Sequence, residues 1–219
     1  MVNVWALKAE GLTFRYGELE LFEGLDLELE PGAVRAVLGP SGSGKTTLVH
    51  LLAGILPLPS GRLWWGEVEV SRRSEEELAR LRRDRVGLVF QHHYLLDELT
   101  ALENVLVPGM IAGRPDPARA QRLIERVGLA GHAHQRPDTL SGGERQRVAV
   151  ARALYPQPRV VLADEPTGAL DRTNARKVKD LLLELAEENG AAVLLATHDE
   201  ALVEGLPAWR LEDGRLVNG

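Results

Sequence analysis

The sequence contains no cysteine among its 219 residues. This absence excludes disulfide bonds, cysteine-based zinc sites and a thiol nucleophile. Long hydrophobic runs are also lacking, because the longest stretch without Asp, Glu, Lys or Arg is residues 46–61, which is 16 residues and includes His50 and two prolines. A helix needs about 20 apolar residues to cross a bilayer, and no basic region followed by an apolar one begins the chain. We therefore expect a cytoplasmic protein that does not itself span a membrane.

An excess of positive charge is missing as well. The chain has 26 Lys and Arg residues against 32 Asp and Glu residues, a formal net charge of −6. Because phosphate neutralisation supplies most of the affinity of sequence-independent nucleic-acid binders, we expect no nucleic-acid partner. The composition, 44% hydrophobic and 26% charged, excludes a disordered chain and is typical of a globular protein with one domain.

Short apolar segments alternate with helical patterns, which predicts an α/β fold with a mainly parallel sheet. Buried strands are expected in four apolar runs, at residues 33–38, 86–90, 160–163 and 191–196. A helical pattern follows the first run through Ile55. The first thirty residues and residues 62–70 have the pattern of antiparallel strands, and residues 209–217 that of a hairpin with Asp213-Gly214 as its turn.

Helix signals replace strand signals in the middle of the chain. Thr100 with Glu103 forms a capping box, and Asp116 before Pro117 has the pattern of an N-cap and a first helical residue. Gly128 is expected to end that helix, and Ser74 to cap another one upstream. We predict one domain over residues 1–219, in which a helical subdomain at about 92–140 is inserted into an α/β core formed by residues 1–91 and 141–219.

A glycine-rich segment lies between the first predicted buried strand and the following helix. Gly39-Pro40-Ser41-Gly42-Ser43-Gly44-Lys45-Thr46 fits G-x-x-x-x-G-K-[ST], the phosphate-binding loop. Its glycines let backbone N–H groups converge on phosphate oxygens, and the helix that follows directs its dipole at the anion. Lys45 supplies a charge for the β- and γ-phosphates, and Thr46 a hydroxyl for Mg²⁺. The predicted nucleotide-binding residues run from this loop through Thr47.

Two carboxylates follow the apolar run 160–163, namely Asp164 and Glu165. Since parallel strands present their carboxyl ends to the ligand crevice, both acids are expected to face the phosphate loop. Asp164 is predicted to hold Mg²⁺ through water, and Glu165 to polarise the attacking water. The alternative is that the pair merely begins a loop before Pro166.

A second glycine-rich helix start occurs at Leu140-Ser141-Gly142-Gly143-Glu144, where Ser141 and Glu144 form a capping box. Two glycines at a helix N-terminus make a second positively polarised anion site, although a capped surface helix is the alternative. The order of the phosphate loop, Gln91, this signature, the Asp-Glu strand and His198 resembles the ATP-binding cassette (ABC) family of transporter ATPases over nearly the whole chain.

The resemblance implies a RecA-like P-loop NTPase core with an N-terminal antiparallel β subdomain and an inserted helical subdomain, and it implies ATP and Mg²⁺ as ligands. It further implies a head-to-tail homodimer, in which Ser141, Gly142 and Gly143 of one copy cover the γ-phosphate of the nucleotide in the other. Asp171, in Ala169-Leu170-Asp171, matches the loop that crosses the dimer interface.

The remaining candidates follow from the same resemblance. Tyr16 matches the aromatic residue that stacks on adenine, with an edge-strand aromatic as the alternative. Gln91 matches the glutamine that senses Mg²⁺ and the membrane subunit, and His198 matches the switch histidine that contacts the γ-phosphate and water. The predicted catalytic residues are thus Glu165, His198, Lys45 and Gln91, and the predicted metal-binding residues Thr46, Gln91 and Asp164.

Residues 91–105 and 167–171 resemble bacterial ATPases of the lipoprotein-release and macrolide-export type, although Asn is frequent in that group where this chain has Ala169. We therefore expect a hydrolase peripheral on the cytoplasmic face of the inner membrane, driving integral membrane permease subunits. The partner is expected to sit near Gln91 and residues 92–110, where Leu95, Leu96, Val105, Leu106 and Val107 could form an apolar groove, with packing in the core as the alternative for these five residues. The alternative is an ATP-driven signalling or gating module of a cell-division-type complex that transports nothing.

Overall fold

The computed structural model describes residues 5–218, and within this range the chain forms two β-sheets. The larger sheet has six strands in the order β10-β9-β3-β8-β7-β6. All neighbours pair in parallel except β10, which is antiparallel to β9 at one edge. The strands are β3 (Val34–Leu38), β6 (Val86–Phe90), β7 (Val160–Asp164), β8 (Ala192–Thr197), β9 (Ala208–Glu212) and β10 (Arg215–Asn218). The predicted α/β fold with a mainly parallel sheet is confirmed.

The predicted strands agree with these bounds to within one residue at either end. The predicted hairpin is β9–β10, with Asp213 at φ 46° and Gly214 at φ 74° in its turn. Positive φ at both central residues gives a two-residue turn the twist that its flanking strands require.

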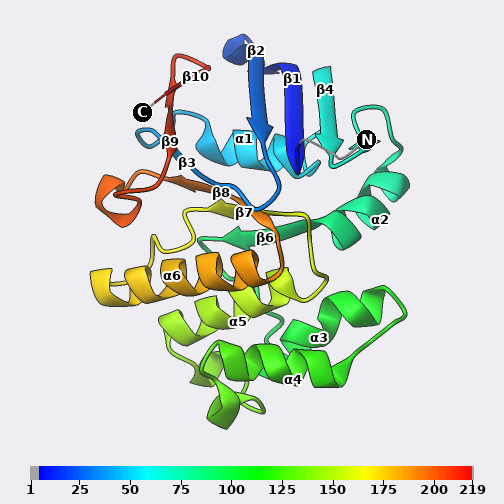
Figure 1. The fold of residues 1–219 in the computed structure, drawn as a ribbon, viewed down its shortest axis with the longest axis vertical. Helices are drawn as coiled ribbons and strands as arrows, with labels where there is room; N and C mark the ends of the chain where they lie inside the picture. Colours follow the sequence, from blue (N-terminus) through cyan, green and yellow to red (C-terminus); the bar gives the residue numbers. More distant parts are fainter. Residues whose placement is uncertain (1–4, 219) are drawn as a thin grey trace.

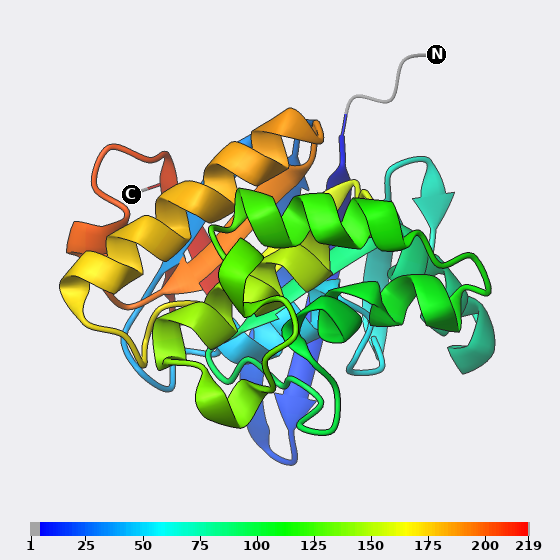
Figure 2. The same ribbon diagram turned by 90° about the horizontal axis from the view of Figure 1, so that it is seen from below.

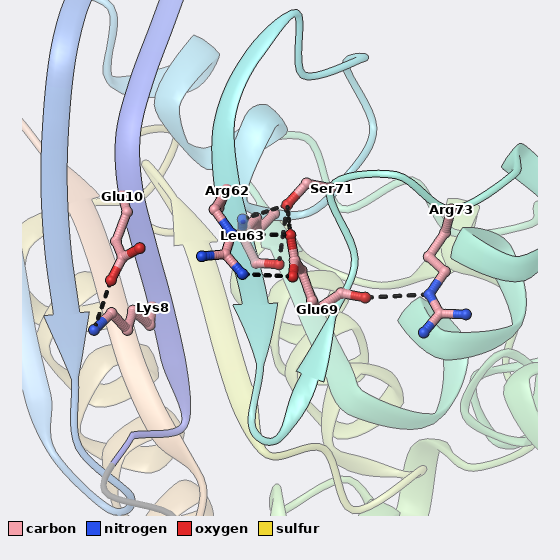
Figure 3. Close-up of polar contacts among 7 residues, drawn as sticks. All are labelled: Lys8, Glu10, Arg62, Leu63, Glu69, Ser71 and Arg73. Atoms are coloured by element: carbon pink, nitrogen blue, oxygen red, sulfur yellow. Dashed lines mark hydrogen bonds and ion pairs between the residues drawn. The ribbon is translucent and has the colours of Figure 1, made fainter.

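The smaller sheet has the order β2-β1-β4-β5, and its strands are all antiparallel, as the sequence predicted. Its strands are β1 (Leu7–Tyr16), β2 (Leu19–Leu29), β4 (Ser60–Trp65) and β5 (Val68–Glu69). Polar contacts hold the short β5 in register with β4 (Figure 3). Arg62 donates two hydrogen bonds to the Glu69 carboxylate at 3.1 and 2.9 Å, and the Leu63 N–H donates to the Ser71 hydroxyl at 2.7 Å.

Helices cover both faces of the larger sheet (Figure 1). The helix α1 (Lys45–Leu52) lies between the two sheets and contacts β7 and β8, whereas α5 (Gly142–Leu154) and α6 (Arg172–Glu188) cover the opposite face. Beyond α5 lie α3 (Ala101–Ile111) and α4 (Pro117–Arg126), the green helices at the near side of Figure 2. The remaining α-helix, α2 (Glu75–Arg85), flanks β6.

The predicted caps begin these helices. Ser74, Thr100 and Ser141 form capping boxes at the starts of α2, α3 and α5. Asp116 accepts the Arg119 N–H at the start of α4, with Pro117 as the first helical residue. Such caps satisfy backbone N–H groups that a helix leaves unpaired, so these starts could be predicted from local sequence.

Two hydrophobic cores lie on opposite faces of the larger sheet. Along β7, Val160 and Leu162 belong to the core shared with α1 and the antiparallel sheet, whereas Val161 and Ala163 belong to the core shared with α3, α4, α5 and α6. Since successive side chains of a strand point to opposite faces, a strand between two cores must be apolar throughout. This explains why the central strands are continuous apolar runs.

One predicted helix boundary is wrong. The helical pattern that was expected to run through Ile55 ends at Leu52, because the chain turns at Gly54 with φ 62° and leaves Ile55 exposed. Residues 92–140 contain α3, α4 and two 3₁₀ turns (Ala130–His132 and Pro137–Thr139) but no strand. The division into subdomains at these bounds stays a prediction. Among residues 5–218, no helix combines the length and the apolar character needed to cross a bilayer.

Candidate active site

The glycine-rich loop joins the carboxyl end of β3 to the first turn of α1. Gly44 precedes α1 with φ 100°, a conformation that strains any residue with a side chain. A Cβ atom there would lie 2.4 Å from Leu21 Cδ2 and 3.0 Å from Phe22 Cζ. Among the described residues no side chain caps α1, so its first N–H groups remain available to an anion.

Lys45 folds back into this loop. Its side chain is 6% exposed, and Nζ donates to the Gly39 and Pro40 carbonyls at 2.8 and 3.0 Å. The same ammonium lies 3.7 Å from Glu165 Oε1. A buried cation is therefore held where the loop, the start of α1 and the carboxyl end of β7 meet.

Glu165 follows β7 directly and has the left-handed φ of 45°, which is rare for a residue with a side chain. Its N–H donates to the Ala196 carbonyl at 2.8 Å. Thr197 Oγ1 donates to Glu165 Oε2 at 3.0 Å, and His198 Nδ1 lies 2.9 Å from Oε1. The end of β8 thus orients the carboxylate of the residue that follows β7.

Asp164, the last residue of β7, lies deeper. It is 7% exposed, and its Oδ1 atom has no hydrogen-bond partner among the described residues. Burial raises the pKa of Asp164 above its ordinary value, although a hydrogen bond with the Thr46 side chain opposes this shift. A buried carboxylate oxygen without a partner is costly unless a cation compensates it.

Lys45 and Glu165 line a cavity of about 530 Å³, whereas Asp164 is not in its lining. Its walls come from β1, β2, the glycine-rich loop, α1 and the residues that follow β6, β7 and β8. The predicted site residues in its lining are Tyr16, Ser41, Gly42, Gly44, Lys45, Thr46, Thr47, Gln91, Glu165 and His198. One cavity therefore joins residues from five separate parts of the sequence.

Comparison with known proteins agrees with this geometry. Residues 22–168, more than half of the chain, match the family described as ABC transporter. The chain belongs to the ABC transporter family. The family and the fold that the motifs predicted are confirmed, and with them the class of ATPase.

Relatives of this ABC protein match it over most of its length. It is 44% identical over 198 residues to the lipoprotein-releasing system ATP-binding protein LolD of Bacteroides fragilis, covering 89% of this chain and 92% of the relative. A protein of the same name from Gluconobacter oxydans is 46% identical over 221 residues, with coverages of 97% and 95%. A solved dimeric structure of the ATP-binding cassette MJ0796, in a post-hydrolysis state bound to ADP and Pi, superposes with a TM-score of 0.86 at 33% identity and 97% coverage of each chain.

The signature residues 141–143 of this ABC protein lie outside the cavity, at the start of α5. Ser141 accepts the Glu144 N–H at 3.3 Å, and its own N–H donates to Glu144 Oε2 at 2.7 Å. A Cβ atom on Gly143 would meet Asn174 at 3.6 Å, which places the signature beside the start of α6. The two predicted anion sites therefore do not meet within one chain.

Asp171 also lies outside the cavity, and it has a local role that the sequence analysis missed. It is the N-cap of α6, where its carboxylate accepts the N–H groups of Thr173 and Asn174 at 2.9 and 3.0 Å. These hydrogen bonds lower the pKa of Asp171. The contact across a dimer interface that the resemblance implies remains a prediction.

The segment that follows Gln91 is tied to α5. Buried Gln146 donates to the Phe90 carbonyl at 2.8 Å, and Arg152 donates to the His93 and Tyr94 carbonyls, each at 2.6 Å. Arg145 Nε lies 2.6 Å from His93 Nε2. Burial, reinforced by the charge of Arg145, lowers the pKa of His93 below its ordinary value.

Sequence reasoning missed three residues at the site. Thr197 orients Glu165, Leu21 lines the cavity, and Gln146 anchors the carbonyl that precedes Gln91. The position of Thr197 at the end of an apolar strand, next to His198, was a usable signal. No local sequence signal marked Leu21 or Gln146, because their places at the site depend on elements that are far away in the sequence.

A separate apolar groove of about 470 Å³ lies where α2, β6 and the end of α3 meet. Its apolar lining includes Val86, Leu88, Phe90, Tyr94, Pro108 and Ile111. None of the five groove residues expected from the sequence is in this lining. Val105 is fully buried in the core, and Leu95 and Leu106 pack against that core, so for these three residues the core-packing alternative is confirmed. The face of α3 that carries Val105 points into the core. The groove lies at the carboxyl end of the helix, at Pro108 and Ile111.

Proposed function

We propose that this chain is the ATP-hydrolysing subunit of a bacterial lipoprotein-releasing ABC transporter. The observation that carries the ATPase role is the cavity in which the glycine-rich loop, Lys45 and the oriented Glu165 carboxylate converge. The lipoprotein-releasing role is supported by relatives of that name, which are 42–47% identical over 85–97% of this chain.

The cavity suits a nucleoside triphosphate. The glycine-rich loop and the uncapped start of α1 supply N–H groups to the phosphates, and Lys45 supplies the charge for the β- and γ-phosphates. Gly39, Pro40 and Ser43 belong to this loop but are not in the lining of the cavity. Thr47 lines the cavity one residue farther along α1. Tyr16 is 52% exposed at the mouth, where an aromatic face is free to stack on adenine.

The same residues fit Mg²⁺. The cation prefers oxygen ligands, and the Thr46 hydroxyl, the Gln91 amide oxygen and the unpartnered Asp164 Oδ1 would hold it directly or through water. When bound, Mg²⁺ neutralises the developing charge on the phosphates.

Hydrolysis requires a water in line with the bond between the γ-phosphorus and the bridging oxygen. Glu165 accepts a proton from this water as its oxygen bonds to the γ-phosphorus, and ADP departs with the bridging oxygen. Thr197 and His198 keep the carboxylate facing the cavity. His198, with 56% of its side chain exposed, is also free to contact the γ-phosphate.

The site is complete in a head-to-tail homodimer. Residues 141–143 lie outside the cavity of their own chain at the start of α5, where a helix N-terminus favours an anion, and they would cover the γ-phosphate in a second copy. Asp171 would cross the interface beside them. The dimeric state of the similar MJ0796 cassette supports this arrangement.

The apolar groove is the proposed seat of an integral membrane permease subunit. It adjoins Tyr94, in the segment that follows Gln91, so a partner seated there touches the chain three residues from the cavity. The protein would then be peripheral on the cytoplasmic face of the inner membrane.

The ATPase role is tested by Glu165→Gln in the full chain, with Glu187→Gln, an exposed glutamate of α6, as the matched control. Because general base catalysis contributes about 10²–10⁴-fold, kcat should fall by that factor in Glu165→Gln while ATP still binds and a dimer accumulates. The control should hydrolyse ATP like the wild type. An unchanged kcat in Glu165→Gln contradicts the proposed base.

The lipoprotein-releasing role needs a separate measurement. The membrane protein that co-purifies with the chain is reconstituted in vesicles with a labelled lipoprotein, and ATP-dependent release is compared between the wild type and Lys45→Ala. Release should require both ATP and Lys45. ATP hydrolysis without release contradicts the transport role and favours the signalling alternative.

A further inference from the structure

One guanidinium group connects two segments that the proposed function places in different nucleotide sites. Arg145, in the second turn of α5, donates through Nη1 to the carbonyls of Pro137 and Leu140, the latter directly preceding Ser141. Through Nε it contacts His93, two residues beyond Gln91. Arg145 therefore links the residue that precedes the signature to the residues that follow Gln91.

The direction of the His93 contact follows from its chemistry. An arginine Nε carries a hydrogen and has no acceptor capacity, so the imidazole Nε2 accepts at 2.6 Å and the ring proton resides on Nδ1. Both side chains are half-buried, which limits competition from water. A hydrogen bond to a charged group is worth roughly ten-fold to a hundred-fold in an equilibrium constant.

The other contacts between α5 and this segment use its backbone. Gln146 and Arg152 bind the carbonyls of residues 90, 93 and 94, which any amino acid would offer. The His93 imidazole, in contrast, is a side-chain acceptor. It accepts from the Arg145 guanidinium, which also donates to the Leu140 carbonyl. A substitution at His93 can thus remove this link while leaving the backbone contacts available.

We propose that His93 is a positioning residue, whose imidazole holds Arg145 and thereby fixes the signature residues 141–143 relative to the segment that follows Gln91. This inference rests on the proposed dimer, in which Gln91 serves the nucleotide of its own chain and the signature serves the nucleotide of the second copy. Loss of the link leaves nucleotide binding to one chain intact and weakens closure of the dimer.

The test uses the full chain with Glu165→Gln, so that ATP is retained, and compares three further substitutions. His93→Gln keeps an acceptor at about the reach of Nε2, His93→Asn keeps one only at the reach of Nδ1, and His93→Leu keeps none. ADP affinity of the monomer is measured by titration calorimetry, and ATP-dependent dimerisation by sedimentation. Thermal unfolding reports the state of the fold.

We expect the ADP affinity of all three variants to remain within about two-fold of the parent, because His93 is not in the lining of the cavity. The ATP concentration for half-maximal dimerisation should rise roughly ten-fold or more for His93→Asn and His93→Leu, and much less for His93→Gln. The double variant His93→Leu with Arg145→Gln should dimerise about as well as Arg145→Gln alone, because both substitutions remove the same contact.

Two results overturn the inference while leaving the proposed dimer in place. One is dimerisation of His93→Leu at the parent's ATP concentration. The other is equal impairment of His93→Gln, His93→Asn and His93→Leu together with lower thermal stability, which indicates general packing. If the Glu165→Gln parent itself does not dimerise with ATP, both the proposed dimer and this inference fail. The behaviour of the parent therefore distinguishes failure of the proposed dimer from failure of this inference alone.

Discussion

The hydroxyl group of Thr197 allows a direct test of how the site orients the proposed base, Glu165. Thr197→Val removes the hydrogen bond to Glu165 Oε2 and preserves the shape of a side chain that is 1% exposed. A hydrogen bond to a charged acceptor contributes about 1.5–3 kcal/mol, and each 1.36 kcal/mol is ten-fold in rate. If the bond serves to aim the carboxylate at the attacking water, kcat should fall about ten-fold to a hundred-fold.

The same substitution has a structural cost that must be separated from the catalytic one. Thr197 Oγ1 also accepts the Asp199 N–H at 3.1 Å, and valine leaves this group without that acceptor. Thermal unfolding measures this loss independently of turnover. Thr197→Ser keeps the hydroxyl and serves as the control.

Steady-state ATP hydrolysis measures the contribution of the Thr197 hydroxyl to turnover. We expect Thr197→Val to lower kcat while the KM for ATP stays within about two-fold, since Thr197 is not in the lining of the cavity. Thr197→Ser should keep most of the wild-type kcat. Wild-type turnover by Thr197→Val, or equal damage in both variants, would refute the role of the hydroxyl.

Three further substitutions test other parts of the molecule. Lys45→Ala should abolish ATP binding in a calorimetric titration, because a buried cation at the phosphates is lost; wild-type affinity would contradict its role. Gly44→Ala should weaken ADP binding at least ten-fold, since it adds a clash with Leu21 to a positive φ, whereas Gly190→Ala, also at positive φ but in open space, should not change binding. Asp171→Ala should lower the midpoint of thermal unfolding by about 2–4 °C through loss of the α6 cap, and Asp171→Asn, an equally good cap, should restore it.

Much of this fold could be predicted because its signals are local. The capping boxes at Ser74, Thr100 and Ser141 involve residues three apart, and the turn at Asp213 needs two residues that tolerate positive φ. The apolar strands could be recognised because both faces of the larger sheet are covered. The glycine-rich loop could be recognised because close approach of the backbone to phosphate excludes side chains at fixed spacings.

The groove shows where this reasoning fails. Five apolar residues between positions 95 and 107 were expected to line it, yet hydrophobicity alone does not distinguish a side chain in a groove from one in the core. Val105 is buried because α3 packs on α4 and α5, and Tyr94, Pro108 and Ile111 reach the groove because α2 lies opposite them. The choice between these two outcomes depends on helices that are distant in sequence.

The sequence by itself indicated where the strands run, how the helices begin and which residues are candidates for binding phosphate, since each of these depends on neighbours a few positions away. Tertiary structure alone decided that Thr197 and His198 orient Glu165 from 32 and 33 residues away, and that Arg145 joins His93 to Leu140. The physical reason is that a hydrogen bond requires two atoms within about 3 Å, and for residues on different elements this proximity is fixed by the packing of the sheet and helices.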